Sequence, residues 1–251
     1  MTGKLFIIGC GPGNPDLLTI KAYNTIIRAE IVLFDNLVSQ EILDLCPKNC
    51  KKIYVGKDPY GQYVPQADIN SLIGHYCHHY ATVLRLKGGD PYIFGRGFEE
   101  RLYANTLGIA TEYIPGISSM QGAGSNDIPL THRGVSEGVW IMTGTKSNGE
   151  LTADLALAAQ SNATVIIYMG MRKVAEIAGT YVRLGKGDTP AAMIQNATCP
   201  NEKSVSCLVK DLQITSLQQQ IHHPAIIIIG AVVDLKLHIH TELQHLGKRI
   251  I

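Results

Sequence analysis

Short apolar runs alternate with helical segments along the first half of the chain, and this alternation constrains the fold more than any other feature. The runs cover residues 4–8, 31–34, 52–55, 82–86 and 112–114, and helical spacing occurs at 16–28, 39–45, 66–80 and 95–107. Because the runs are apolar along most of their length, they are typical of parallel strands covered on both faces. We predict an N-terminal α/β lobe, residues 1–135, with a mostly parallel sheet and helices on both faces.

The pattern restarts after residue 133 and then changes character. Strand-like runs lie at 139–142, 164–168, 191–194, 204–209 and 225–229, and helical segments lie at 151–160, 171–183 and 213–221. The last two runs frame only a short polar helix, which favours a mixed sheet. We therefore predict a second α/β lobe, residues 136–251, joined without a long linker, and a ligand cleft between the lobes.

The charge of the chain excludes some classes of partner. Lys and Arg number 22 against 21 Asp and Glu, a net charge of +1, so no overall field would attract nucleic acid or an anionic membrane. An anionic ligand would need local cations. No apolar stretch approaches the roughly 20 residues that span a bilayer, and the N-terminus lacks a signal-peptide pattern. We expect a cytoplasmic protein.

The six cysteines are scattered and do not resemble the disulfide framework of a secreted protein. Cys46 and Cys50, together with His75, His78 and His79, suggest a zinc site only loosely, because their spacing fits no usual tetrahedral pattern. Ordinary thiols and a solvated helix face are the favoured interpretation. We predict no metal.

A glycine-rich loop, Gly9-Cys-Gly-Pro-Gly13, follows the first predicted strand and precedes a helix. It partly matches a dinucleotide-binding fingerprint, but Asn14 stands where the third glycine is needed for close helix packing. Pro12 also removes a backbone donor from the loop. A structural glycine turn is therefore favoured over an NAD(P) site.

The segment from Arg85 to Glu100 contains the densest group of candidate ligand-binding residues. Gly88 and Gly89 would let a ligand approach the backbone, and the guanidinium of Arg96 lies between two glycines before a helix. Such an arrangement suits recognition of a carboxylate or phosphate. A glycine-rich turn with a solvated arginine is the alternative.

The motifs taken together point to one family. Besides residues 9–19 and 85–100, they are Asp35-Asn-Leu-Val38, Val55-Gly-Lys57, Pro115-Gly-Ile-Ser-Ser119, Ile128-Pro-Leu-Thr-His-Arg133, Tyr168-Met-Gly170, Thr189-Pro-Ala191 and Pro224-Ala-Ile with Gly230. In these residues the chain resembles the tetrapyrrole methylase family, and within it the uroporphyrinogen-III C-methyltransferases. The resemblance extends from residue 4 to about residue 234.

The resemblance implies a methyl donor, S-adenosylmethionine, and a set of residues that contact it. By motif position these are Pro12, Gly88, Gly89, Asp90, Ile93, Ser118, Ser119, Met169 and Ala197. The carboxylate of Asp90 could accept a hydrogen bond from the donor, and Met169 could pack against it, unless Met169 is a core residue. Departures from the family pattern are Ala197 in place of glycine, Glu202 in place of glutamine, and the polar stretch 124–128.

The resemblance also implies the acceptor, uroporphyrinogen III, whose carboxylates would be bound by Arg96, Arg133 and His132, with Lys57 and Arg85 as further candidates. Arg85 could instead lie on the surface. By family position Asp35 is the proton acceptor and Lys57 the proton donor, with Arg96 as a rival; Asp35 could alternatively cap a helix. The product would be precorrin-2 and the assembly a homodimer. Other interpretations are a methyltransferase of a later corrin intermediate, a tetrapyrrole carrier, or an NAD-dependent oxidoreductase.

Overall fold

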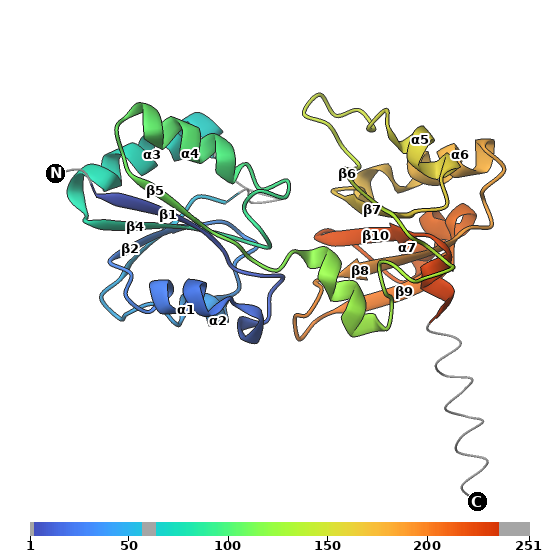
Figure 1. Ribbon diagram of the computed structural model, residues 1–251, viewed down its shortest axis with the longest axis horizontal. Coiled ribbons are helices and arrows are strands. Elements are labelled where there is room, and N and C mark those ends of the chain that lie inside the picture. Colours follow the sequence, from blue (N-terminus) through green and yellow to red (C-terminus); the bar gives the residue numbers. More distant parts are fainter. Residues whose placement is uncertain (1–2, 57–63, 236–251) are drawn as a thin grey trace, which may run out of the picture. The chain divides into compact units, whose positions relative to one another are not determined.

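The computed structural model describes residues 3–56 and 64–235. The chain divides into two compact units, Met1–Ser119 and Met120–Ile251, and each has its own five-stranded sheet (Figure 1). The two-lobed α/β class expected from the sequence is confirmed. The predicted boundary lies after residue 135, but Ala123 and Ile128 are buried in a core cluster of the second unit, so contacts divide the chain earlier.

Five parallel strands form the sheet of the first unit in the order β3-β2-β4-β1-β5. Their bounds are Lys4–Gly9 for β1, Ile31–Phe34 for β2, Lys51–Tyr54 for β3, Thr82–Lys87 for β4 and Thr111–Ile114 for β5. Because every pair is parallel, all carboxyl ends lie on one edge of the sheet. Loops that are far apart in the sequence therefore become neighbours there.

Helices cover both faces of this sheet, as predicted (Figure 1). One face packs against α1 (Ile20–Ile26) and α2 (Gln40–Leu43), and the other against α3 (Gln66–His79) and α4 (Gly97–Thr106). Successive strand residues point to opposite faces, so Val32 packs with α1 and α2 while its neighbours Ile31 and Leu33 pack with α3. This is why the strands are apolar throughout.

The predicted helix at 16–28 is divided in the structure. A short 3-10 helix, η1 (Pro15–Leu17), precedes α1, and the Thr19 hydroxyl accepts a hydrogen bond from the backbone N–H of Ala22. Thr19 therefore caps a new helix rather than continuing the first one.

The second unit has a mixed sheet in the order β6-β7-β10-β8-β9, also as predicted. The bounds are Val139–Thr143 for β6, Thr164–Tyr168 for β7, Pro190–Gln195 for β8, Lys203–Leu208 for β9 and Ala225–Ile229 for β10. Only β6 and β7 pair in parallel. Since β10 runs antiparallel to both β7 and β8, these two strands share a direction and end at the same edge.

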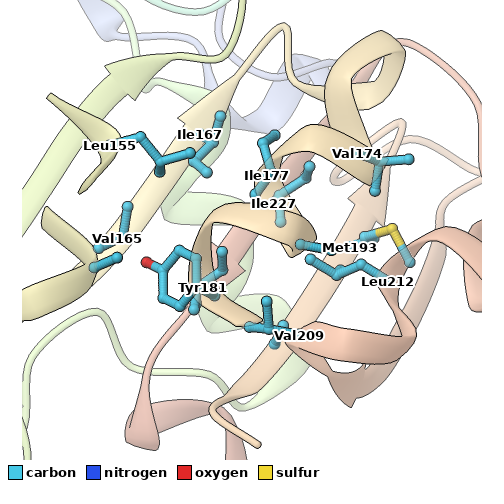
Figure 2. Packing of buried hydrophobic residues seen from close by; sticks show 14 of the residues in the cluster. Leu155, Val165, Ile167, Val174, Ile177, Tyr181, Met193, Val209, Leu212 and Ile227 are labelled. Carbon is cyan, nitrogen blue, oxygen red and sulfur yellow. The ribbon is translucent and has the colours of Figure 1, made fainter. Parts of the chain in front are cut away.

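Each face of this second sheet is buried by different elements. On one face lie α5 (Leu155–Gln160), α6 (Val174–Arg183) and α7 (Leu212–Gln218), and Figure 2 shows how their side chains pack with the strands. The other face is covered by residues of η2 (Ser119–Asn126) and η5 (Ala231–Asp234). Two further 3-10 turns, η3 (Met171–Lys173) and η4 (Val209–Asp211), precede α6 and α7.

The central strand β10 is a run of isoleucines because both of its faces are buried. Ile227 and Ile229 belong to the cluster with α5, α6 and α7, whereas Ile226 and Ile228 belong to the opposite cluster. Both faces are therefore apolar. Within residues 3–56 and 64–235, every helix is too short or too polar to cross a lipid bilayer.

Replacing Ile227 by Ala should destabilise the second unit. The side chain is fully buried between the sheet and α6, so its loss leaves a cavity that costs about 2–5 kcal/mol. Ile214→Ala is the matched control, because Ile214 is 51% exposed on α7 and its loss should change stability by less than about 1 kcal/mol. Urea denaturation followed by circular dichroism measures both; equal effects would contradict the assigned core.

Candidate functional site

At the carboxyl edge of the first sheet, three loops pack against one another through backbone atoms. They follow the neighbouring strands β4, β1 and β5. Gly11 and Gly89 exchange two hydrogen bonds, with N···O distances of 3.3 Å from Gly11 N and 2.7 Å from Gly89 N. A Cβ on Gly9 would lie 2.5 Å from the backbone nitrogen of Gly116, and one on Gly116 would overlap the carbonyl oxygen of Gly89. These positions must be glycine because no side chain fits between the loops.

Asp90 ties the loop after β4 to the loop after β5. Its Oδ1 accepts from the Tyr92 backbone N–H at 2.8 Å, and its Oδ2 accepts from the Tyr113 hydroxyl at 2.6 Å and the Gly116 N–H at 3.1 Å. Burial and the adjacent Asp90 raise the pKa of Tyr113, so its hydroxyl stays protonated and donates.

This arrangement changes the expectation for Asp90. Its side chain is 7% exposed and both carboxylate oxygens already accept hydrogen bonds from neighbouring loops. The carboxylate therefore holds the loops together. Its predicted contact with the donor stays a prediction.

The first unit brings together most of the predicted donor-binding residues. Seven of them lie in the three loops at the sheet edge: Pro12, Gly88, Gly89, Asp90, Ile93, Ser118 and Ser119. A Cβ on Gly89 would be 3.8 Å from Ser118, so these two positions face each other. Met169 and Ala197 belong to the second unit, where they follow β7 and β8 at a common sheet edge.

Met169 is not a core residue. Its side chain is 54% exposed and its backbone has a φ of +54°, while its carbonyl accepts from the Thr145 hydroxyl. A non-glycine residue in the left-handed backbone region is uncommon, and here it places the methionine side chain in an exposed position at the end of β7.

The departures from the family pattern form one connected structure. Glu202 accepts from the Thr198 backbone N–H with one oxygen and, at 3.0 Å, from the Asn126 side chain with the other. Both carboxylate oxygens of Glu202 therefore accept hydrogen bonds within the protein. The sequence alone instead suggests an additional negative charge near an anionic ligand. Ala197 is 5% exposed and its methyl group packs in the core, where Gly122 leaves room for it.

Asp35 follows β2, directly beside the end of β4. Its Oδ1 accepts from the Leu37 backbone N–H at 3.2 Å, and its Oδ2 lies 3.6 Å from Nη2 of Arg85. Ser39 occupies the N-cap position of α2, so the capping interpretation of Asp35 does not hold. Lys57, the predicted proton donor, lies outside the described residues.

Arg85 is buried, at 2% exposure, which contradicts both its surface interpretation and its role as a substrate-binding arm. Its partner Glu100 is fully buried on α4, and Lys87 is 4% exposed beside them. Sequence reasoning missed Glu100 and Lys87. The available signal was a strand of buried character containing two cations, because such charges require a buried counter-charge.

The predicted acceptor-binding residues are exposed. Arg96 is the N-cap of α4 with a φ of +59°, and its Nη2 lies 2.6 Å from Oε2 of Glu99. His132 and Arg133 lie in the second unit, where Nδ1 of His132 is 2.9 Å from the Arg133 carbonyl oxygen.

The cysteine and histidine groups do not assemble into a metal site. Cys46 and Cys50 are buried in the first unit's core, and burial raises the pKa of the Cys46 thiol to about 12. The rings of His75 and His79 lie 4.5 Å apart on the surface of α3. Across residues 3–56 and 64–235, no group of three or more His, Cys, Asp or Glu side chains is placed to hold a metal ion.

The fold and the loops define a two-unit α/β protein whose glycine-rich loops meet at the carboxyl edge of a parallel sheet. Residues 4–213 match the family described as Tetrapyrrole (Corrin/Porphyrin) Methylases. The chain belongs to this family, which confirms the resemblance seen in its motifs.

Individual relatives agree with this assignment. The uroporphyrinogen-III C-methyltransferase of Bacillus subtilis is 40% identical over 235 residues, which cover 92% of this chain and 91% of that protein. The siroheme synthase of Chromobacterium violaceum is also 40% identical over 235 residues, but these cover 93% of this chain and 50% of the relative. The chain thus spans about half the length of the siroheme synthases that it matches.

Solved structures are similar over the same extent. A uroporphyrin-III C-methyl transferase from Thermus thermophilus, complexed with S-adenyl homocysteine, has a TM-score of 0.81 and 35% identity and covers 93% of this chain and 100% of its own. A cobalt precorrin-4 methyltransferase has a TM-score of 0.82 and 25% identity, with 92% and 96% of the two chains covered.

Replacing Tyr113 by Phe should loosen the loop platform. The change keeps the ring, which stacks on Tyr92 at 4.0 Å, and removes only the hydrogen bond to Asp90. A hydrogen bond to a charged group contributes about 1.5–3 kcal/mol, so the first unit should lose stability in that range. Tyr103→Phe is the control, since the Tyr103 hydroxyl has no hydrogen bond in the described part of the chain. Thermal unfolding that gives equal results for both variants would contradict the bracing role of Asp90.

Proposed function

We propose that the protein is a uroporphyrinogen-III C-methyltransferase, which transfers methyl groups from S-adenosylmethionine to C2 and C7 of uroporphyrinogen III and releases precorrin-2. The observation that carries this proposal is the glycine platform after β4, β1 and β5, which holds seven of the nine predicted donor-binding residues. Support comes from the Thermus relative, crystallised with the demethylated form of that donor, and from the Bacillus relative that is matched over nearly its whole length.

The platform suits an adenosyl donor because the ligand can approach peptide groups directly where side chains are absent. Gly89 supplies such backbone, since a Cβ there would meet only Ser118, at 3.8 Å, whereas the absent side chain of Gly88 makes room for Leu37. Pro12 and Ile93 add apolar surface. The donor supplies an electrophilic methyl group on a sulfonium, and the protein supplies orientation. Met169 and Ala197 are included as donor-binding residues only because their motif positions resemble those of the family.

The acceptor carries carboxylates on every pyrrole ring, whereas the whole chain has a net charge of only +1. Local cations must therefore bind it, and we assign Arg96, Arg133 and His132 to this role. Arg96 now pairs with Glu99, but both side chains are about half exposed. An exposed ion pair contributes at most about 1 kcal/mol, so a substrate carboxylate can replace Glu99 at small cost.

The chemistry requires one nucleophile and one proton acceptor. A pyrrole carbon attacks the methyl carbon, the new C–C bond forms as the C–S bond breaks, and the donor leaves as a neutral thioether; the positively charged macrocycle then loses a proton. We assign the role of proton acceptor to Asp35. Its side chain is 20% exposed and so can be reached, while Leu37 and Arg85 hold its two oxygens. By the same resemblance Lys57 would return a proton, with Arg96 as the rival for proton handling.

We further propose a homodimer in the cytoplasm, using a donor but no metal. The six cysteines are free thiols and four of them are buried, which suits a reducing compartment. Precorrin-2 would then feed sirohaem, cobalamin or haem d1 synthesis.

Purified protein mixed anaerobically with S-adenosylmethionine and uroporphyrinogen III should form a product that carries two added methyl groups. The reason is that one chain contains both the loops proposed to bind S-adenosylmethionine and the cations proposed to bind uroporphyrinogen III. Mass spectrometry and absorbance follow the reaction. Binding of the donor without methyl gain would instead favour a later corrin acceptor, and failure to bind the donor would favour a carrier.

The Asp35→Asn variant should turn over at least about tenfold more slowly, because an amide keeps the shape of the side chain but cannot accept the proton. Its dissociation constant for S-adenosylhomocysteine, measured by calorimetry, should stay within about twofold of wild type. Asp68→Asn, an exposed change at the start of α3, is the matched control and should retain full activity. Normal turnover in Asp35→Asn would remove Asp35 from the mechanism.

A further inference from the structure

Three charged side chains are buried behind Asp35 in the first unit. Arg85 and Lys87 lie on β4, and Glu100 lies on α4, with exposures of 2%, 4% and 0%. Arg85 and Lys87 alternate with Leu84 and Leu86, so they point to the sheet face that α3 and α4 cover. Burying such a group is costly unless geometry and hydrogen bonds compensate.

Glu100 is the hub of this cluster. Its Oε1 accepts from Nε of Arg85 at 3.2 Å, from Nζ of Lys87 at 3.1 Å and from the side chain of Gln66 at 3.3 Å. Burial alone would raise the pKa of Glu100, but the charges of Arg85 and Lys87 outweigh it, and the pKa lies below its ordinary value. Glu100 is therefore a carboxylate.

Glu100 determines where the guanidinium of Arg85 points. Nε of Arg85 is held by Glu100, and Nη1 donates to the carbonyl oxygens of Leu86 at 2.8 Å and Leu33 at 3.5 Å. With these two nitrogens fixed in a planar group, the direction of Nη2 is also fixed. Nη2 is the nitrogen that lies 3.6 Å from Oδ2 of Asp35.

The carboxylate of Asp35 is thus held from both sides. The Leu37 backbone N–H holds Oδ1, and Arg85 holds Oδ2. We propose that Glu100 and Arg85 are positioning residues for Asp35: Glu100 orients Arg85, and Arg85 fixes the carboxylate in the direction from which it takes the proton. This inference rests on the proposed role of Asp35 as proton acceptor.

The charges of the cluster agree with such a role. Arg85 and Lys87 are balanced by Glu100 and Asp35 only while Asp35 is ionised. A purely structural requirement would be met as well by apolar side chains, because replacing a buried ion cluster with a packed apolar group is often neutral or stabilising. The cluster also ends at the loop edge of β4, where Asp35 is, rather than in the middle of the sheet.

A double-mutant cycle on Glu100 and Asp35 tests this proposal. Turnover of methyl transfer to uroporphyrinogen III is measured for wild type, Glu100→Gln, Asp35→Asn and the double variant. Glu100→Gln should slow turnover about tenfold when Asp35 is present, because the carboxylate loses its fixed direction. In the Asp35→Asn background the same change should alter turnover by less than about twofold, since nothing remains to be positioned.

Two measurements separate positioning from damage to the fold. The dissociation constant for S-adenosylhomocysteine and the unfolding temperature should distinguish a local effect from a loosened first unit. Glu41→Gln, an exposed change on α2, is the matched control and should behave as wild type. If Glu100→Gln does not fold, Arg85→Lys replaces it in the cycle, because lysine keeps the charge but lacks the planar fork.

The outcomes distinguish this proposal from the function on which it rests. Wild-type protein that transfers no methyl group overturns both together. Asp35→Asn with normal turnover overturns the positioning role and the assignment of the proton acceptor, and leaves the methyl transfer itself standing. A slow Asp35→Asn with a normal Glu100→Gln overturns the positioning role alone. An equal loss from Glu100→Gln in both backgrounds also overturns it, since that result describes a structural defect.

Discussion

The close packing of peptide groups between the loops after β4, β1 and β5 is the constraint on which the rest of the site depends. A side chain on Gly9 or Gly116 would collide with backbone of a neighbouring loop, and Gly89 has a φ of +66°, which glycine adopts without strain. The parallel sheet brings the three loops to one edge, and Asp90 then locks two of them through Tyr113 and the Gly116 N–H. The three loops are therefore packed against one another by backbone, and this packing defines the platform on which the proposed donor site is built.

Electrostatics in this protein are local. The net charge is +1, yet one face of the first sheet contains a buried cluster in which Arg85 and Lys87 meet Glu100. Exposed pairs such as Arg96 with Glu99 contribute little, whereas the side chains of the buried cluster are held in fixed positions. The same types of residue therefore serve two purposes, and burial decides which.

Sequence patterns predicted the regular elements of the fold well, because continuous burial makes both faces of a strand apolar, as in the isoleucines of β10. They also located the loops of the candidate site. They failed where a residue's role depends on its partner: Arg85 resembled a surface or ligand-binding cation until Glu100 was seen beneath it, and Asp90 resembled a free acceptor. The unit boundary differed because η2 packs on the second sheet, which periodicity does not reveal.

The loop after β8 shows how departures from a family pattern can compensate one another. Glu202 and Asn126, the second of which lies in the polar stretch 124–128, are hydrogen-bonded to each other, and Glu202 also accepts a hydrogen bond from the Thr198 backbone N–H. Ala197 adds a methyl group that is accommodated in the core opposite Gly122. When each of these residues is compared separately with the family pattern, it suggests a disturbed ligand site. Taken as a connected set, they close the loop and satisfy its polar groups, so the backbone at the edge of the second sheet keeps a defined conformation.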